Sequence, residues 1–293
     1  MRKFLSGLVI VTAVGMAGFF ILTQPQTAPE DALAGVVPNP ENGRLVFVAA
    51  GCGACHVAPG EKLSENPVLA GGKPFPSPFG TFYAPNISTD SEHGIGSWTA
   101  QDLLNALHHG TAPDGRHYYP AFPFTTYSRM TVQDAADLHG YLMTLPPASA
   151  ADQPHDVGFP FSIRRGLGLW KRLFLSQDWA TDSTEERGRY LVEALGHCSE
   201  CHTPRNALGG LNRDAWLTGA PNPAGKGEVP GLHPDQLGWS IEDMVYYFQT
   251  GLTPDYDSVG GAMAEVIEGL STLPEEDLRA IARYLGSLPP SGH

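Results

Sequence analysis

Apolar residues along this 293-residue chain recur mainly at the spacing of amphipathic helices, with Gly- and Pro-rich stretches between them. Two stretches show the helical pattern clearly, and each stops at a Pro-Pro pair, which cannot continue a helix. Their apolar stripes are Leu138, Tyr141, Leu142 and Leu145 in the first and Leu278, Ile281, Leu285 and Leu288 in the second. Irregular connections are expected over residues 71–85 and 221–230. The pattern therefore predicts a mainly α fold.

A further helix pattern occurs twice. In residues 98–110, Thr99 suits an N-cap, Asp102 is the acidic residue three positions later, and Gly110 suits the helix end. The same pattern recurs at identical spacing in residues 239–251. Two further pairs of motifs match between the halves of the chain. Before the helix pattern, Gly43-Arg44 matches Gly188-Arg189; after it, the two stretches that end at Pro-Pro match each other. The three matches follow the same order in both halves. This order indicates one duplicated helical domain.

The N-terminus carries an apolar run from Phe4 to Leu22, preceded by Arg2 and Lys3. A helix of that length rises about 28 Å, close to the hydrocarbon thickness of a bilayer, about 30 Å. The apolar core of a secretory signal is shorter, although the small residues around Leu33 leave a cleaved signal as the alternative. We favour an uncleaved anchor in a bacterial inner membrane, with the basic end cytoplasmic and the rest of the chain periplasmic.

All four cysteines lie in two copies of one pentapeptide, Cys52-Gly53-Ala54-Cys55-His56 and Cys198-Ser199-Glu200-Cys201-His202. Cys-x-x-Cys-His is the attachment signal of c-type haem, in which the thiols form thioethers and the histidine becomes an axial ligand of iron. A thioredoxin-like pair or a structural zinc site would not call for a histidine after each pair. The sequence therefore predicts two covalently bound haem c groups. Helices over residues 44–50 and 190–195 should lead into the two attachment sites.

The sixth iron ligands are sought among the four methionines that lie beyond the apolar run. Met244 takes the place of Leu103 in the repeat, and Met143 lies on a closing helix, so we assign both to packing. Met130 and Met263 fall in stretches that we expect to be irregular, each before a closing helix. We predict them as the sixth ligands, with an insertion between Met263 and its closing helix.

Histidine could replace methionine in the first half, where the candidates are His93, His108, His109 and His117. His-Met ligation raises the haem potential and fills both axial positions, which favours electron transfer over catalysis at the iron. The alternative is a dihaem enzyme such as a peroxidase or a thiosulfate dehydrogenase, which needs an open or displaceable axial position. We therefore expect a chain that is not an enzyme on its own.

Further motifs carry a family resemblance. They are Ala70-Gly71-Gly72, Gly80-Thr81-Phe82-Tyr83-Ala84-Pro85-Asn86-Ile87, Pro113-Asp114-Gly115-Arg116, Tyr119-Pro120-Ala121-Phe122-Pro123 and Cys201-His202-Thr203-Pro204-Arg205-Asn206. In these the chain resembles the cytochrome c subunits of membrane-bound alcohol and gluconate dehydrogenases. The resemblance implies methionine ligands at Met130 and Met263, and electron transfer from a periplasmic dehydrogenase subunit to the respiratory chain. Those subunits typically carry three such pentapeptides, so quinone, another cytochrome and a terminal oxidase all remain possible acceptors.

These features together predict two tandem class-I-like cytochrome c domains after an N-terminal transmembrane helix. We expect an anchor and linker in residues 1–34, a first haem domain in 35–150, an interdomain segment in 151–180, and a second haem domain in 181–293.

The segment 159–179, which we term the strap, is basic and aromatic; it contains Phe159, Phe161, Arg164, Arg165, Trp170, Lys171, Arg172 and Phe174. Three roles compete for it: packing between the haem domains, docking of the dehydrogenase subunit, or contact with the membrane surface. We favour packing between the domains.

Charge bears on the partners. The formal net charge is -13, of which -10 falls in residues 181–293 and -4 in 35–150, whereas 151–180 carries +1. Such acidity disfavours binding to nucleic acid. An acidic face suits the steering of a basic redox partner, although it also serves plain solubility.

Overall fold

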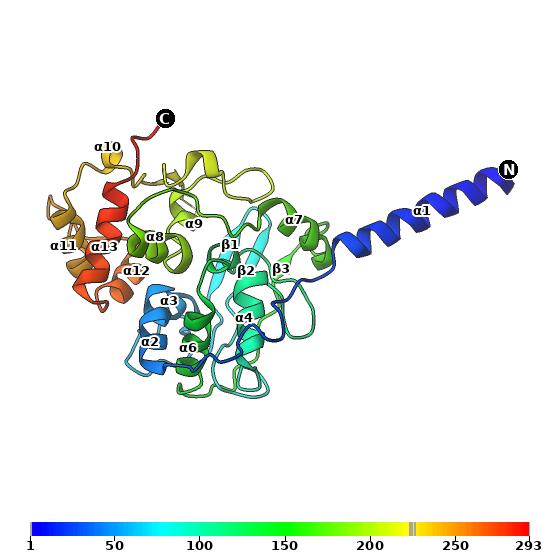
Figure 1. The fold of residues 1–293 in the computed structure, drawn as a ribbon, viewed down its shortest axis with the longest axis horizontal. Coiled ribbons are helices and arrows are strands. Elements are labelled where there is room, and N and C mark those ends of the chain that lie inside the picture. The colour runs from blue at the N-terminus through cyan, green and yellow to red at the C-terminus, as the bar shows by residue number, and fades with distance from the viewer. Residues whose placement is uncertain (1, 223–224, 226, 293) are drawn as a thin grey trace.

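The computed structural model describes residues 2–222, 225 and 227–292 and shows a mainly helical body from which one long helix projects (Figure 1). The projecting helix is α1 (Arg2–Leu22). The first half of the body contains α2 (Pro40–Ala49), α3 (Cys52–His56), α4 (Ala100–His109), α5 (Phe124–Tyr127) and α6 (Val132–Leu142). The strap contains η1 (Arg164–Gly166) and α7 (Leu167–Phe174). The second half contains α8 (Glu186–Tyr190), η2 (Leu191–Leu195), α9 (Ser199–His202), η3 (Arg213–Ala215), α10 (Pro234–Leu237), α11 (Ile241–Thr250), α12 (Ala262–Leu270) and α13 (Glu275–Gly286).

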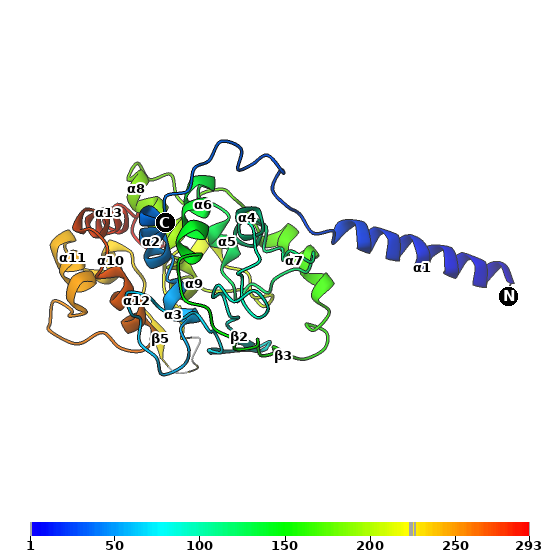
Figure 2. The ribbon, with the colours of Figure 1, turned by 90° about the horizontal axis from the view of Figure 1, so that it is seen from below.

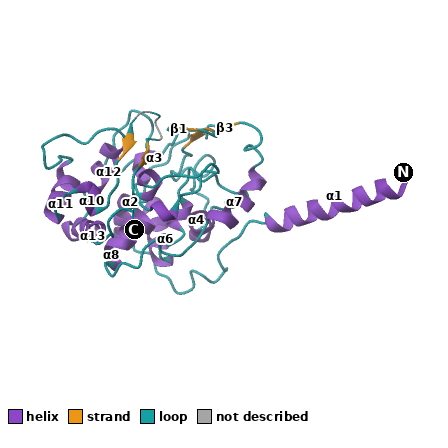
Figure 3. Cartoon of the chain, turned by 90° about the horizontal axis from the view of Figure 1, so that it is seen from above, coloured by secondary structure: helices purple, strands orange, loops and turns teal. Residues whose placement is uncertain are grey.

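Short strands supplement the helices at one side of the body (Figure 3). Residues 71–85, which we expected to be irregular, contain the antiparallel hairpin of β1 (Pro74–Ser77) and β2 (Gly80–Tyr83). A third strand, β3 (Asp156–Val157), pairs with β2. In the second half β4 (Ala220–Pro221) pairs with β5 (Glu228–Val229). The expectation of irregular chain was wrong here, because prolines are rare in strands except at a sheet edge, and β1 is an edge strand.

The twice-occurring helix pattern is confirmed in α4 and α11. Thr99 accepts a hydrogen bond from the Asp102 amide at 3.2 Å, and the Asp102 carboxylate accepts one from the Thr99 amide at 2.8 Å. Ser240 and Asp243 form the same capping box before α11. Both helices end at a glycine in the left-handed conformation, which is a common way for a helix to end because glycine adopts it without strain.

The helices that lead into the attachment sites cross the closing helices at glycines. A Cβ on Gly43 would lie 2.0 Å from the Asp137 carbonyl oxygen, and a Cβ on Gly188 would lie 2.0 Å from the Ala280 carbonyl oxygen. The first of these helices begins at Pro40 rather than at residue 44, because Asn39 accepts hydrogen bonds from the amides that follow it. The glycines let α2 approach α6, and α8 approach α13, at backbone distance.

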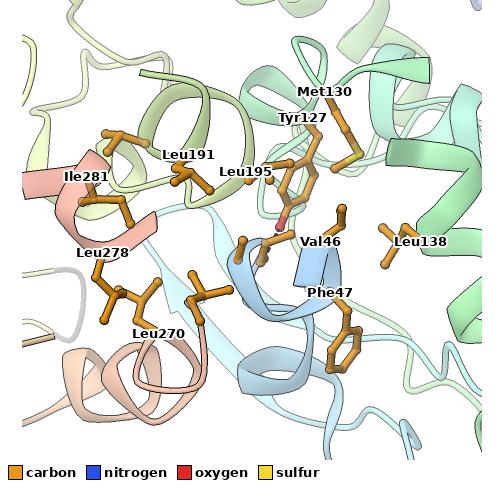
Figure 4. Packing of buried hydrophobic residues seen from close by; sticks show 14 of the residues in the cluster. Val46, Phe47, Tyr127, Met130, Leu138, Leu191, Leu195, Leu270, Leu278 and Ile281 are labelled. Atoms are coloured by element: carbon orange, nitrogen blue, oxygen red, sulfur yellow. Dashed lines mark hydrogen bonds between the residues drawn. The ribbon is translucent and has the colours of Figure 1, made fainter. Parts of the chain in front are cut away.

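The apolar faces of these helices meet in one buried cluster that includes residues of both halves (Figure 4). Val46, Phe47 and Leu138 belong to the first half, and Leu191 and Leu278 to the second. The cluster joins the two halves across α2, η2, α12 and α13. The helices that bear the attachment motifs therefore share one core.

The crossing of α8 and α13 predicts the effect of adding a methyl group at Gly188. Gly188→Ala should lower the free energy of unfolding by about 1–3 kcal/mol, since the added carbon must push α13 away. Gly286→Ala on α13 is the matched control, because a Cβ there meets nothing within 4 Å. Chemical denaturation of the haem-loaded protein measures both. Equal effects of the two substitutions would contradict the close crossing.

Candidate haem-attachment sites

Both pentapeptides form short helical turns that follow the leading helices. The first occupies α3, and the second forms Cys198 with α9. All four thiols are free, so the chain retains every cysteine that thioether formation requires. Burial raises the pKa of Cys52 and of Cys198 to about 12. These thiols are therefore neutral groups packed into the body rather than exposed redox-active thiolates.

The histidine of each pentapeptide is oriented by a main-chain carbonyl group. His56 Nδ1 lies 2.8 Å from the Pro85 carbonyl oxygen, and His202 Nδ1 lies 2.7 Å from that of Pro230. A carbonyl oxygen can only accept, so Nδ1 carries the hydrogen and Nε2 presents its lone pair. Burial lowers the pKa of both imidazoles, which favours the neutral form that binds metal. This is the usual arrangement of a metal-binding histidine and its outer partner.

A glycine in the left-handed conformation positions each of these carbonyl groups. The Gly71 amide donates to the His56 carbonyl oxygen at 2.8 Å, and a Cβ on Gly71 would lie 2.5 Å from the Pro85 oxygen. In the second half the Gly219 amide donates to the His202 carbonyl oxygen at 2.8 Å. Pro85 and Pro230 were not predicted as site residues from the sequence. In the sequence, Pro85 follows His56 by 29 residues and Pro230 follows His202 by 28, and this similar spacing is the signal that could have identified them.

The two methionines predicted as distal ligands lie in different surroundings. Met130 is 2 % exposed and follows α5, just before Thr131 caps α6. Met263 was expected in an irregular stretch, and this is wrong: it lies in the first turn of α12. The rest of that helix lies between Met263 and α13, where we expected an insertion. It forms because Ala262, Met263, Ala264 and Glu265 favour a helix, and because the helix packs on α2 and α3 of the other half.

The contacts of the other methionines and of two histidines show which of them could serve as a sixth iron ligand. Met244 is buried on α11 and Met143 ends α6, as packing roles require. His117 has both ring nitrogens engaged, with Thr23 and Lys171, which argues against a ligand role. His108 is buried beside the Met130 main chain, and its Nε2 has no hydrogen-bond partner among the described residues. His108 therefore remains the histidine alternative in the first half.

The two attachment segments lie against each other. A Cβ on Gly51, which precedes Cys52, would lie 3.2 Å from Nε2 of His197, which precedes Cys198. The Tyr127 ring packs on His197, and its hydroxyl donates to the Ala50 carbonyl oxygen at 2.7 Å. The close approach requires a glycine at position 51, where φ is 63°. The sites thus adjoin across the core shared by the two halves.

Polar contacts tie each attachment segment to the opposite half. Glu200, inside the second pentapeptide, accepts hydrogen bonds from Thr125 at 3.2 Å and from Thr126 at 3.3 Å. Lys73 donates to the Ala54 carbonyl oxygen inside the first pentapeptide at 2.9 Å and also forms an ion pair with Glu265 on α12. Each segment is therefore fixed by its own half and by the other.

The residues present fit covalent attachment of haem c. Each short turn supplies two free thiols and one histidine whose Nε2 is available. No group of three or more His, Cys, Asp or Glu side chains suited to a metal ion occurs in the described ranges, so a thiolate zinc site is not assembled there. The fold and the donor atoms together define a c-type cytochrome.

Comparison with known proteins leads to the same class. The family described as Cytochrome c matches residues 40–146. A "Diheme cytochrome c-type" protein of Cereibacter sphaeroides is 49% identical over 292 residues, covering 98% of each chain. The fructose dehydrogenase cytochrome subunit of Gluconobacter japonicus is 39% identical, and the cytochrome c subunit of the quinone alcohol dehydrogenase of Gluconobacter oxydans is 34% identical. These alignments cover 99% and 97% of this chain, but 60% of each of those subunits.

The chain therefore belongs to the cytochrome c family, with a dihaem cytochrome and dehydrogenase cytochrome subunits among its relatives. Its cofactor is covalently bound haem c, and its chemistry is electron transport.

The contact between Gly71 and Pro85 predicts a change in the haem bound at His56. Gly71→Ala should displace the Pro85 carbonyl group, weaken its hydrogen bond with His56, and raise one midpoint potential, because the imidazole then donates less charge to ferric iron. Potentiometric titration measures the shift. Gly72→Ala is the matched control, since its φ is also positive but its Cβ has no contact closer than 3.8 Å. The same shift in both variants would point to backbone strain alone.

Proposed function

We propose that this chain is a membrane-anchored dihaem cytochrome c that carries electrons from a periplasmic dehydrogenase to the respiratory chain. The observation that carries the proposal is the repetition of one site. Each half has its own thiol pair and its own histidine oriented by a proline carbonyl group, and the two segments adjoin at Gly51 and His197.

The proposal includes two tandem class-I-like haem domains, residues 35–150 and 181–293. Repeated main-chain contacts around the sites support it. The Ile87 amide donates to Leu69 at 3.0 Å, and the Leu232 amide donates to Leu217 at 2.8 Å. After α4 and α11, Thr111 bridges to His117 and Leu252 to Ser258 in matching turns. Two copies that agree at this level of detail are the expected product of duplication.

In each domain the cysteines and histidine of the pentapeptide would hold one haem, with Met130 or Met263 as the second axial ligand. The thioether-forming residues are Cys52 and Cys55 with the ligand His56, and Cys198 and Cys201 with the ligand His202. When bound, haem c supplies reversible one-electron oxidation and reduction. The protein contributes a fixed imidazole orientation, and the Met130 side chain is buried.

The electron donor in this proposal is a dehydrogenase subunit. Three of the relatives are named as cytochrome subunits of fructose, alcohol and gluconate dehydrogenases, which supports a partner of that class. The acceptor is quinone, another cytochrome or a terminal oxidase. Since the chain has two pentapeptides, we favour passage through both haems before the acceptor is reached.

The location in this proposal is the bacterial inner membrane, with both haem domains in the periplasm. Residues Lys3–Leu22 form a helix long and apolar enough to cross a membrane, although a signal sequence would pass the same criterion. Support for an uncleaved helix comes from its C-terminal end, where Thr23 is buried and Arg172 donates to the Leu22 carbonyl oxygen at 2.6 Å. A segment destined for removal has no need of such contacts.

The ligand assignment predicts a spectroscopic result. Met130→Leu and Met263→Leu should each remove about half of the methionine-to-iron absorption band of the oxidised protein and lower one midpoint potential. Met143→Leu and Met244→Leu are the matched controls, because they make the same change at packing positions in each half. An unchanged band in Met130→Leu, together with a new high-spin ferric haem in His108→Leu, would transfer the ligand role to His108.

The same spectra separate the carrier from the alternative enzyme. A carrier with both axial positions filled is low spin in the ferric state and binds cyanide slowly. A high-spin ferric haem in the unmodified protein, with rapid cyanide binding, would favour a peroxidase or a thiosulfate dehydrogenase.

A further inference from the structure

The strap is fixed to the end of α1. A Cβ on Gly168 would lie 2.6 Å from Thr23 Cα, so α7 touches the end of that helix at backbone distance. Arg172 Nε donates to the Leu22 carbonyl oxygen at 2.6 Å, and Arg165 Nε donates to Thr23 Oγ1 at 2.9 Å. The last carbonyl groups of a helix lack partners within it, and cations there are favoured by the helix dipole. Two arginines thus cap α1.

A second layer of contacts joins this end to the first half of the body. His117 Nε2 donates to the Thr23 carbonyl oxygen at 2.9 Å, and Lys171 lies 3.0 Å from His117 Nδ1. Lys171 also donates to the carbonyl oxygens of His109 at 2.6 Å and Gly110 at 2.7 Å. All these groups are main-chain atoms or buried side chains. The position of α7 relative to the end of α1 is therefore fixed.

The inner side of the strap packs on the haem-domain segments. Trp170 Nε1 donates to the Leu208 carbonyl oxygen at 2.9 Å, and the Phe174 ring covers Gly210. Trp170 also meets the Phe124 ring of the first half at 6.1 Å. Packing between the halves, the role that we favoured from sequence, accounts for this side of the strap. It leaves the outer side unexplained.

The strap also exposes five large apolar residues that this packing does not cover. Phe159 is 82% exposed, Leu173 68%, Ile163 50%, Phe161 46% and Leu169 39%. We call these five residues the strap face. They occur within a short stretch of chain, whereas single exposed apolar residues are usually scattered over a protein surface. A concentration of this kind marks a surface that meets an apolar phase or a partner.

The position of the strap beside α1 favours a membrane, rather than a protein, as the partner of the strap face. Figures 1 and 2 show α7 at the end of the body from which α1 projects, while α11 and α13 lie at the opposite end. Where α1 leaves a bilayer, residues fixed beside its last turn lie at the height of the lipid headgroups. Phe20 and Ile21 in the last turn of α1 are exposed as well, and Arg165 of the strap lies over the Phe20 ring.

The charge of the strap also favours a membrane as its partner. The stretch between Val157 and Gln177 contains Arg164, Arg165 and Arg172 and no acidic residue, in a chain of net charge -13. Its fourth basic residue, Lys171, is buried and does not take part. Basic groups near a bilayer are attracted to anionic headgroups, and long basic side chains extend their charge into the interface while their stems remain in apolar surroundings. Apolar and basic side chains side by side are the composition of interfacial membrane-binding helices.

We propose that the strap face binds the headgroup region of an anionic phospholipid bilayer beside α1, so that the body rests on the membrane in one orientation. The proposal rests on the function proposed above only in requiring that α1 is an uncleaved anchor. It adds a second membrane contact, and it places the second half at the end of the body farther from the bilayer.

Spin labelling of the full-length, haem-loaded protein tests this inference. The native cysteines are committed to haem, so single cysteines introduced as Leu173→Cys, Tyr256→Cys and Val11→Cys can each carry one nitroxide. Tyr256 is 77% exposed in the turn after α11 and serves as the matched aqueous control, and Val11 reports on the insertion of α1. The protein is reconstituted into vesicles of mixed phosphatidylglycerol and phosphatidylcholine with its haems in the ferric state, and the collisions of each label with oxygen and with a water-soluble nickel chelate are compared.

The expected result is that labels at positions 11 and 173 collide mainly with oxygen, which concentrates in lipid, while the label at 256 collides mainly with the nickel chelate. A lipid-exposed label at 11 with a chelate-exposed label at 173 would overturn the strap inference but leave the anchor intact. The strap face would then be free to receive a protein partner. Chelate exposure at both 11 and 173 would overturn the anchor and the strap inference together.

Discussion

The hydrogen bond between a histidine Nδ1 and a proline carbonyl group is the interaction on which the candidate sites depend. Without it, the imidazole following each cysteine pair could rotate and present either nitrogen. The neighbouring structure serves to hold that carbonyl group: Gly71 approaches Pro85 at backbone distance in the first half, and Gly219 approaches the chain around Pro230 in the second. The repetition of this detail is why we treat the halves as two copies of one functional unit.

Part of this account could be predicted from the sequence, because it rests on local chemistry. Capping residues predicted the start of α4, and the pentapeptide predicted the attachment turn. The histidine-orienting carbonyl groups could not be predicted, since any residue has a carbonyl group and only the tertiary fold brings Pro85 to His56. The irregular surroundings expected for Met263 were wrong for a similar reason. The paired glycines before α12 suggested a loop, whereas packing on α2 and α3 supports a helix.

The packing of the two halves against each other could not be predicted from the sequence either. Matching motifs indicate duplication but not how the copies pack, and here the residues before the two cysteine pairs, Gly51 and His197, are in contact. The strap packs on both halves and also caps the end of α1 through Arg165 and Arg172. These contacts join α1, the strap and the adjoining sites, which in the proposed function would keep the electron path at a fixed position relative to the membrane.

In the proposed function, one chain holds two covalently attached haems, each with both axial positions filled. Intact-mass measurement of the full-length protein, combined with electron paramagnetic resonance of its ferric state, tests this proposal. We expect a mass excess of two haems per chain and two low-spin ferric signals without a high-spin signal. A mass excess of one haem, or a high-spin ferric signal of comparable intensity in the unmodified protein, would contradict it.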